Sequence, residues 1–549
     1  MPSDLEIAHD CTLKPISEIA HKLNLSECDY DTYGPHIAKI KLNVLEKTAA
    51  NPKGKLILVT TINPTPAGEG KTTTTIGLAQ ALTLLGKKTS LAIREPSLGP
   101  MMGIKGGATG GGKSQVVPME DINLHFTGDM HAITSAHNLL ASLLDNHIHH
   151  GDEYHIDPRY IVWPRVLDIS DRALRNTVIG LGGPTDGVPH QTQFAITPAS
   201  EIMAILCLSK NLADLKERLS RIIVAYTYDN KPITAADLDA VGAMAVLLKD
   251  AIKPNLVQTL EGTPAFIHGG PFANIAHGTN SIISTQLALQ LSDYVITEAG
   301  FGSDLGAEKY FNIVCPTAGF TPDACVIVVT TRSLKHNGGG DGLSALKIGL
   351  DNLDKHIDNV KSHGVPLLVA INEFSEDLPE EIDCIISHCK DHNIPVASST
   401  IWSEGGEGGV ELAGQLVSLL HNTENNYHPL YDHNLPIKDK IQHIATQIYG
   451  ADRVVYTVNA EKDIALAENL GLDNLPICVA KTASSLSDDP KLLGRPSGFK
   501  ITVRQIRFSA GAGFLVALTG KITTMPGLPK KPASAGIDLH SDGSIIGLH

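Results

Sequence analysis

Short apolar runs, each bounded by polar or turn-forming residues, recur along much of the chain. One run is "KLILVTTI" at 55–62, and similar runs stand in "DYVITEAG", "CVIVVTT" and "PLLVAIN". Their length and β-branched content are typical of strands that a parallel sheet buries on both faces. The segment 71–85 has helical spacing and is followed by the strand-like "KTSLAI", so that 55–93 predicts a βαβ unit. We therefore predict an α/β fold with a P-loop NTPase-like parallel sheet domain.

The pattern changes to helical spacing between about 121 and 260. Thr197 is a predicted N-cap, with Pro198 at the first helical position of the long segment that follows. We predict a mainly helical domain at 121–260, inserted into a P-loop α/β domain of residues 1–120 and 261–361. Renewed strand and helix alternation predicts a further α/β domain at 362–549. A chain of 549 residues is long for one core, which agrees with several domains.

Two glycine-rich loops compete as the phosphate site. "GATGGGKS" at 107–114 satisfies the Walker A pattern, whereas "TPAGEGKT" at 65–72 has a threonine in place of the first glycine. A phosphate loop needs a strand before it and a helix after it, and only the second loop has both, because Pro118 interrupts any helix after the first. The glycine loop at 106–112 is interpreted as a substrate cover or a tight packing turn. The predicted ATP-binding residues are Thr65, Pro66, Ala67, Gly68, Glu69, Gly70, Lys71 and Thr72.

Charged residues follow two of the predicted strands. Arg94 and Glu95 stand at the carboxyl edge beside the phosphate loop, the place where open α/β sheets bind ligands. Glu298 ends another apolar strand, as a Walker B acid does. With the Thr72 hydroxyl, it is the predicted Mg²⁺ site. The alternatives are a salt bridge for Arg94 and a turn-capping acid for Glu298.

Histidine and aromatic residues add further candidates. The loop "FIHGGPFANIAHGTNS" is dense in glycine and histidine, which suggests ligand contact, and we select His268 before His277 as a functional residue. The run "DNHIHHGDEYHID" lacks metal-ligand spacing and is interpreted as a helix end. Phe374 and Trp402 both come just after strands and could stack on the two sides of a flat heterocycle. A structural histidine and core packing are the respective alternatives.

Charge and composition exclude several classes of protein. The net charge is −15 and no basic run exists, so we expect no nucleic-acid partner. No apolar run is long enough to span a bilayer, so we expect no membrane partner. The eight cysteines include no C-x-x-C pair and no signal peptide precedes the first helix, which favours a cytoplasmic protein with free thiols.

Several long segments together resemble the formate–tetrahydrofolate ligase family. They are "TPAGEGKTTTTIGLAQAL", "REPSLGP", "VVPMEDINLHFTGD", "FIHGGPFANIAHGTNS", "EAGFGSDLGAEK" and "TMPGLPK". The family's ATP loop, T-P-x-G-E-G-K-[ST], matches Thr65–Thr72. The resemblance implies that ATP with Mg²⁺ activates formate to formyl phosphate. N10 of tetrahydrofolate then attacks it, giving 10-formyltetrahydrofolate, ADP and phosphate.

The resemblance also implies roles for individual residues. Matching positions make Lys71 and Arg94 the groups that stabilise the transferring phosphoryl group. The formyl phosphate pocket would be lined by Glu95, Asp129 and His268, and the pterin would lie between Phe374 and Trp402. Glu373 stands where the family pattern leads us to expect a neutral or basic residue, and Lys113 stands where the family more often has a tyrosine. These two departures affect the expected fine contacts with the substrates and not the expected reaction.

The resemblance has implications beyond single residues. It implies a homotetramer and a monovalent cation as activator. The sequence has no segment like the dehydrogenase/cyclohydrolase domain of multifunctional relatives, so we expect the single-activity form.

Two other functions remain compatible with a nucleotide loop. A ligase of the same class could use another small carboxylate, which assays of ADP release with different acids would distinguish. A nucleotide switch would hydrolyse ATP without formate or tetrahydrofolate, and the folate-side motifs would then have no role.

Overall fold

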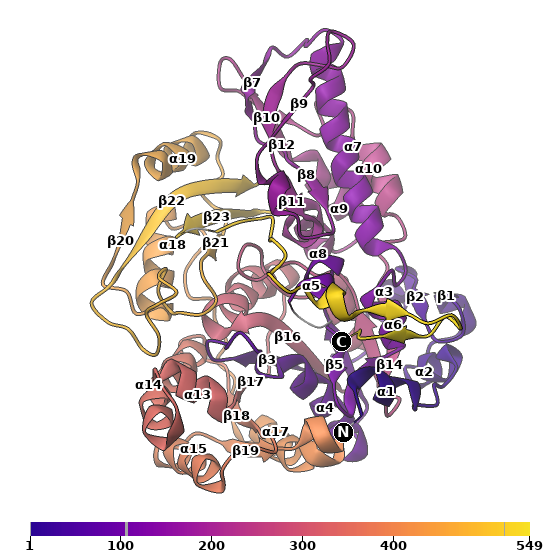
Figure 1. Cartoon of the computed structure of the whole chain (residues 1–549), viewed down its shortest axis with the longest axis vertical. Coiled ribbons are helices and arrows are strands. Elements are labelled where there is room, and N and C mark those ends of the chain that lie inside the picture. The colour runs from indigo at the N-terminus through magenta and orange to yellow at the C-terminus, as the bar shows by residue number, and fades with distance from the viewer. Residues whose placement is uncertain (1, 105–107, 521, 549) are drawn as a thin grey trace.

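A large, mostly parallel sheet runs through the computed structural model, which describes residues 2–104, 108–520 and 522–548 (Figure 1). Its strand order is β1-β2-β14-β15-β4-β16-β3-β17-β18-β19, and every neighbouring pair from β15 to β19 is parallel. The order starts with β1 (Tyr30–Thr32), β2 (Ala38–Ile40) and β14 (Asn255–Thr259). The prediction of an α/β fold with a parallel sheet is confirmed. In spatial order, the parallel strands are β15 (Pro264–Ile267), β4 (Thr89–Ile93), β16 (Tyr294–Gly302), β3 (Lys55–Thr61), β17 (Ala324–Val329), β18 (Leu367–Asn372) and β19 (Val396–Ser399).

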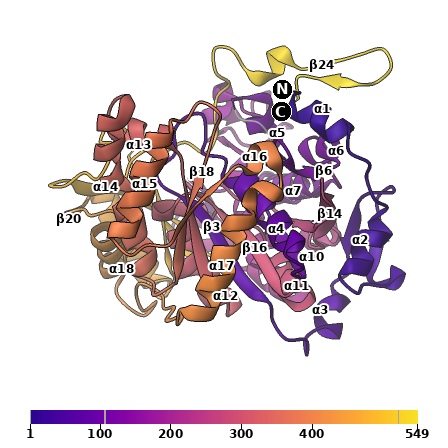
Figure 2. The same cartoon turned by 90° about the horizontal axis from the view of Figure 1, so that it is seen from below.

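Both faces of this sheet are covered by helices. On one face, Ile57 and Val59 of β3 share a core with α4 (Lys71–Leu84) and α17 (Val410–Asn422). On the other, Leu56 and Leu58 share a core with α11 (Ile282–Leu291) and α14 (Gly342–Lys361). Figure 2 shows the helices on either side of the strands. Because successive side chains of a strand point to opposite faces, burial on both sides requires the unbroken apolar runs seen in the sequence.

The segment 121–260 contains short strands as well as helices, which the prediction of a mainly helical domain did not include. It extends upward in Figure 1 along α7 (Asp129–His149), but β7 (Ile156–Ile161), β12 (Ile223–Thr227) and β13 (Pro232–Thr234) form a small sheet beside that helix. These strands are short and β7 is partly exposed, so they lack the long apolar runs that mark the central strands. The end of the segment, β14 (Asn255–Thr259), belongs to the large sheet.

The predicted helix start at Thr197 is displaced by three residues. Thr197–Ala199 forms a 3₁₀ turn, and α8 (Glu201–Leu208) is instead capped by Ser200, whose Oγ accepts a hydrogen bond from the Met203 amide at 3.1 Å. The expected helix end in the histidine-rich run is confirmed, since α7 ends at His149.

The predicted domain boundary at residue 362 falls inside the large sheet. It lies between β17 and β18, which are hydrogen-bonded neighbours. A separate sheet, ordered β20-β22-β23-β21, comprises β20 (Arg453–Tyr456), β21 (Ile477–Ala480), β22 (Lys500–Ser509) and β23 (Phe514–Thr519) and has its own core. Local periodicity cannot tell which sheet a strand joins, because that depends on long-range hydrogen bonds.

The loop with the strict Walker A letters leads into a strand. Gly110–Gly111 (β5) and Ser114–Val117 (β6) pair as an antiparallel hairpin, and β6 continues onto β14. Gly106 and Gly107 lie outside the described residues. The prediction that this loop lacks a following helix is therefore confirmed. Among the described residues, no helix combines the length and apolar character that crossing a bilayer needs.

Candidate active site

The Thr65–Thr72 loop connects β3 to α4, as the sequence pattern predicts. Gly70 is the N-cap of α4, with a left-handed backbone (φ 69°) and no side-chain capping bond. The first-turn amide N–H groups of a helix have no partner within the helix, and the helix dipole adds positive charge there. The geometry suits an anion at the start of α4.

Glu69 holds the loop closed from within. Its Oε1 accepts a hydrogen bond from the Thr65 amide at 2.6 Å, and its Oε2 accepts one from the Thr330 hydroxyl at 2.6 Å. The side-chain amide of Asn372 donates to the Glu69 backbone carbonyl at 3.1 Å, and the Arg332 guanidinium donates to the Gly68 backbone carbonyl at 2.6 Å. Because Glu69 is buried and both of its carboxylate oxygens are used, it positions the loop.

Glu298 gathers the predicted phosphate-binding groups at the end of β16. Its Oε2 accepts hydrogen bonds from Lys71 Nζ at 2.6 Å and from Thr72 Oγ1 at 2.8 Å, and its Oε1 accepts one from Arg94 at 3.3 Å. Burial by itself would raise the pKa of Glu298, but the Lys71 and Arg94 cations outweigh it and lower that pKa to about 2. The structure thus brings Lys71, Thr72, Arg94 and Glu298 together, with the carboxylate ionised.

Asp129 lies in a second buried cluster. At the first residue of α7, its Oδ1 is 2.7 Å from Lys39 Nζ, and its Oδ2 accepts a hydrogen bond from the Asn255 amide at 2.8 Å. Both members of the Lys39–Asp129 pair are inaccessible to solvent. Sequence reasoning missed Lys39, and the signal available was a lysine between apolar residues in "HIAKIKL".

Glu95 follows Arg94 in the sequence, and the charge of Asp129 in the second cluster influences its titration. It is buried, and this burial, reinforced by the negative charge of Asp129, raises the pKa of its carboxyl group well above the usual value. Glu95 Oε2 and Arg94 Nε are both buried, and neither has a hydrogen-bond partner among the described residues. Buried polar atoms normally have partners, so each of these two atoms is a candidate ligand contact.

His268 is close enough to this cluster for Asp129 and Lys39 to influence its titration, but its ring is held by protein groups. Nε2 contacts the Ala251 carbonyl at 2.6 Å and Nδ1 contacts the Ser281 hydroxyl at 2.6 Å. A carbonyl only accepts, so Nε2 carries the proton. Burial lowers the pKa of His268 to about 4, which keeps the ring neutral. In this structure, neither ring nitrogen faces an open ligand space.

The two aromatic candidates lie in different surroundings. Phe374 lines a cavity of about 750 Å³ together with Thr65, Pro66 and Ala67, and the Arg332 guanidinium lies 5.3 Å from its ring centroid. Trp402 is in α16 (Ile401–Glu404) and packs against the glycine hairpin. Trp402 is outside the set of described residues that line the Phe374 cavity, so the pterin sandwich stays a prediction.

The two positions that depart from the family pattern are both held through their backbone amides. The exposed Lys113 donates its amide N–H to the Trp402 carbonyl at 2.9 Å. Glu373, directly after β18, donates its amide N–H to the Ser399 carbonyl at 3.0 Å.

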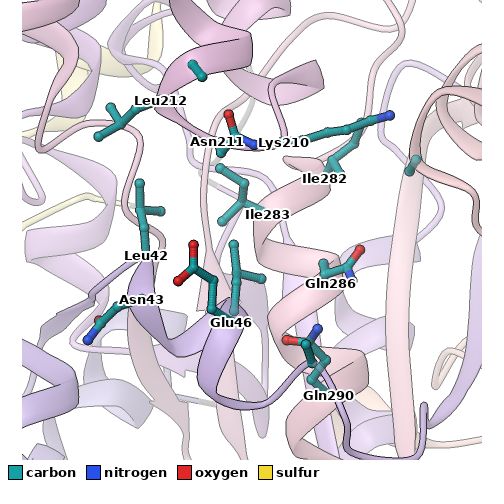
Figure 3. Close-up of a pocket in the computed structure, with 14 residues that line it drawn as sticks. Leu42, Asn43, Glu46, Lys210, Asn211, Leu212, Ile282, Ile283, Gln286 and Gln290 are labelled. Atoms are coloured by element: carbon teal, nitrogen blue, oxygen red, sulfur yellow. The ribbon is translucent and has the colours of Figure 1, made fainter.

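A second cavity lies apart from these groups. It has a volume of about 700 Å³ and opens between α3 (Asn43–Lys47), the start of α9 (Leu212–Ser220) and α11 (Figure 3). None of the predicted site residues lines it.

Three positioning residues that sequence reasoning missed share one signal. Each is a polar residue at the end of a central strand or within two residues after it, a signal similar to the one that identified Arg94. They are Asn63 after β3, Thr330 after β17 and Asn372 at the end of β18.

Comparison with known proteins gives two findings. A family model described as formate–tetrahydrofolate ligase matches residues 2–549, essentially the whole chain. Among solved structures, translation elongation factor SelB from Methanococcus maripaludis, in complex with a GTP analogue, matches at 18% sequence identity with a TM-score of 0.17. That match covers 24% of this chain and only 26% of the SelB chain.

We predict that Gly70→Ala weakens ATP binding at least tenfold more than Gly68→Ala. Both glycines have positive φ, at 69° and 81°, so both substitutions carry the backbone cost of roughly 1–2 kcal/mol. Only at Gly70 would the new Cβ meet another group, Asn372 Nδ2 at 2.3 Å. Nucleotide titration measures the difference, and adding Asn372→Ala to Gly70→Ala should restore part of the affinity. Equal losses in the two single variants would contradict this account of the loop.

Buried neutral histidines should make the fold sensitive to acid. Burial lowers the pKa of His277 to about 3, whereas the unfolded chain takes up that proton near pH 6.5. The unfolded state therefore binds more protons below pH 6.5, and stability falls as the pH falls towards 3. We predict that His277→Leu removes about 2 kcal/mol of this loss at pH 5, seen as a smaller drop in Tm between pH 7 and pH 5. The exposed His150→Leu should leave the drop unchanged.

Proposed function

The chain belongs to the formate–tetrahydrofolate ligase family, and from this premise we propose that it makes 10-formyltetrahydrofolate through a formyl phosphate intermediate. Members of this family are ATP-dependent ligases that join formate to tetrahydrofolate. The observation that supports the proposed route is the convergence of Lys71, Thr72 and Arg94 on Glu298, at the start of α4. We propose that the β3–loop–α4 unit is a P-loop and binds the ATP phosphates.

Formate needs activation because hydroxide is a poor leaving group. In the first step, a formate oxygen attacks the γ-phosphorus of ATP, the bond to the β-phosphate oxygen breaks, and ADP leaves. Negative charge spreads over the transferring phosphoryl oxygens, and preorganised cations stabilise that charge most in a buried site. Lys71 and Arg94 supply two cations, and Glu298 keeps both in place before substrate arrives.

Thr72 and Glu298 fit a magnesium ion. Their side-chain oxygens are 2.8 Å apart, close to the roughly 2.9 Å between adjacent oxygens around an octahedral Mg²⁺. The ionised state of Glu298 also suits this role. When bound, the ion would neutralise phosphate charge.

Glu95 is proposed to bind the formyl group as a neutral acid. Burial and the negative charge of Asp129 raise its pKa, which favours the protonated carboxyl group, and that form can donate a hydrogen bond to a formate or formyl oxygen. Arg94, the preceding residue, offers its unpartnered Nε to the same ligand. In the second step, N10 of tetrahydrofolate attacks the formyl carbon, the carbon–oxygen bond to phosphate breaks, and N10 loses a proton.

The remaining contacts are proposed from the family resemblance. Asp129 and His268 would shape the formyl phosphate pocket, His268 by holding Ser281 and Ala251. Phe374 and Trp402 would bind the pterin. A homotetramer, activation by a monovalent cation and a cytoplasmic location stay predictions.

We predict that Lys71→Ala lowers the rate of 10-formyltetrahydrofolate formation by at least about 10²–10³-fold, because it removes a cation from the transferring phosphoryl group. Lys113→Ala is the matched control from the loop with the strict Walker A letters and should change the rate little, since Lys113 is exposed. A coupled assay with ATP, formate and tetrahydrofolate measures both. If both variants lose activity equally, the loop assignment is wrong. If ADP forms equally well without formate, the proposed reaction is wrong.

We predict that Glu95→Gln keeps kcat/KM for formate within about tenfold, whereas Glu95→Leu loses about 100-fold, because glutamine retains a hydrogen-bond donor and leucine does not. Steady-state kinetics with varied formate at saturating ATP separates the two variants. Equal impairment of both would mean that Glu95 acts as a carboxylate and not as a neutral donor.

A further inference from the structure

Asp354, His388 and His392 form a compact group outside the site described above. Asp354 is on α14, His388 is on α15 (Pro379–Asp391), and His392 follows directly at the end of α15. One potential ligand atom from each residue lies within 4.8 Å of the others. Figures 1 and 2 both show α14 and α15 side by side, and the two helices are in contact.

Helical spacing aligns the two histidines. Residues four apart lie on the same face of a helix, and the rings of His388 and His392 have centroids 4.4 Å apart. Asp354 reaches this pair from the neighbouring helix, with its Oδ1 2.8 Å from His388 Nε2. The group therefore offers two imidazoles and one carboxylate from two helices.

The hydrogen bonds prepare His392 as a ligand. Its Nδ1 is 2.8 Å from the His388 carbonyl, and since a carbonyl only accepts, Nδ1 carries the proton. Nε2 of the neutral ring then has a free lone pair. A hydrogen bond from one ring nitrogen to a backbone carbonyl, with the other nitrogen on the ion, is the usual arrangement of a metal-bound histidine.

We propose that Asp354, His388 and His392 bind a transition-metal dication, with Zn²⁺ as the ion of matching chemistry. Two imidazoles and a carboxylate, with water as a fourth ligand, suit Zn²⁺, whereas Mg²⁺ and Ca²⁺ prefer oxygen ligands. Ligands around a tetrahedral zinc are roughly 3.4 Å apart, so the His388–Asp354 pair opens slightly and the wider separations close by side-chain rotation. The ion replaces the proton that His388 Nε2 donates to Asp354.

This site would stabilise a helix that supports the nucleotide loop. α14 also carries Asn352, whose side-chain amide donates to Asn63 Oδ1 at 2.9 Å. It carries His356 as well, whose Nε2 accepts a hydrogen bond from the backbone N–H of Asn63 at 3.0 Å. Asn63 is at the root of the Thr65–Thr72 loop. A metal that joins α14 to α15 therefore stabilises the helix that holds this root.

Zinc titration of the full-length protein tests the proposal. After chelator treatment, calorimetry with Zn²⁺ should show a site that Asp354→Asn and His392→Ala each weaken 10–100-fold. Zn²⁺ should raise the Tm of the parent protein and not that of His392→Ala. His392 is exposed, so its substitution should leave the fold intact.

The matched control is His421→Ala, an exposed histidine at the end of α17. It should bind Zn²⁺ as the parent protein does. Parent-like affinity in both His392→Ala and Asp354→Asn would overturn the proposal, as would an equal loss in His421→Ala. Because the readouts are binding and Tm in the absence of substrates, they are independent of the proposed ligase reaction.

Discussion

The buried carboxylate of Glu298 is the constraint on which the candidate site depends. An ionised group without solvent costs several kcal/mol unless cations and hydrogen bonds compensate it. Lys71, Thr72 and Arg94 provide that compensation. Lys71 and Thr72 begin α4 after β3, and Arg94 directly follows β4, so the cations come from the strands on either side of β16. Satisfying Glu298 therefore places Lys71 and Arg94 together at the start of α4, where the proposed phosphoryl transfer needs cations.

The pKa values of two carboxyl groups at this sheet edge shift in opposite directions because their surroundings differ. Glu298 faces two cations, and its pKa falls to about 2. Glu95 is equally buried but faces the negative charge of Asp129, and its pKa rises well above the usual value. Glu298 is an anion that holds cations, whereas burial and the negative charge of Asp129 favour the protonated form of Glu95. This division suits a reaction that handles both phosphate and formyl groups.

The root of the Thr65–Thr72 loop also links distant parts of the chain. The side-chain amide of Asn63 donates a hydrogen bond to the Ala483 carbonyl at 3.3 Å. Nearby in the sequence, the buried Lys481 forms a salt bridge with Asp304, which follows β16. α14 holds Asn63 from the other side through Asn352 and His356. Contacts from the segment after β21 and from α14 therefore meet at Asn63, so changes in either can reach the loop.

The sequence by itself determined the central strands, the helix after the Thr65–Thr72 loop, and which of the two glycine loops has a strand before it and a helix after it. These follow from local periodicity and from the strand and helix that flank a phosphate loop. Only the tertiary structure decided that β18 and β19 join the large sheet, that Lys39 pairs with Asp129, that both nitrogens of His268 are occupied, and that Asp354 meets His388 and His392. Each of these depends on contacts between residues far apart in the chain, and such contacts produce no local periodic pattern in the sequence.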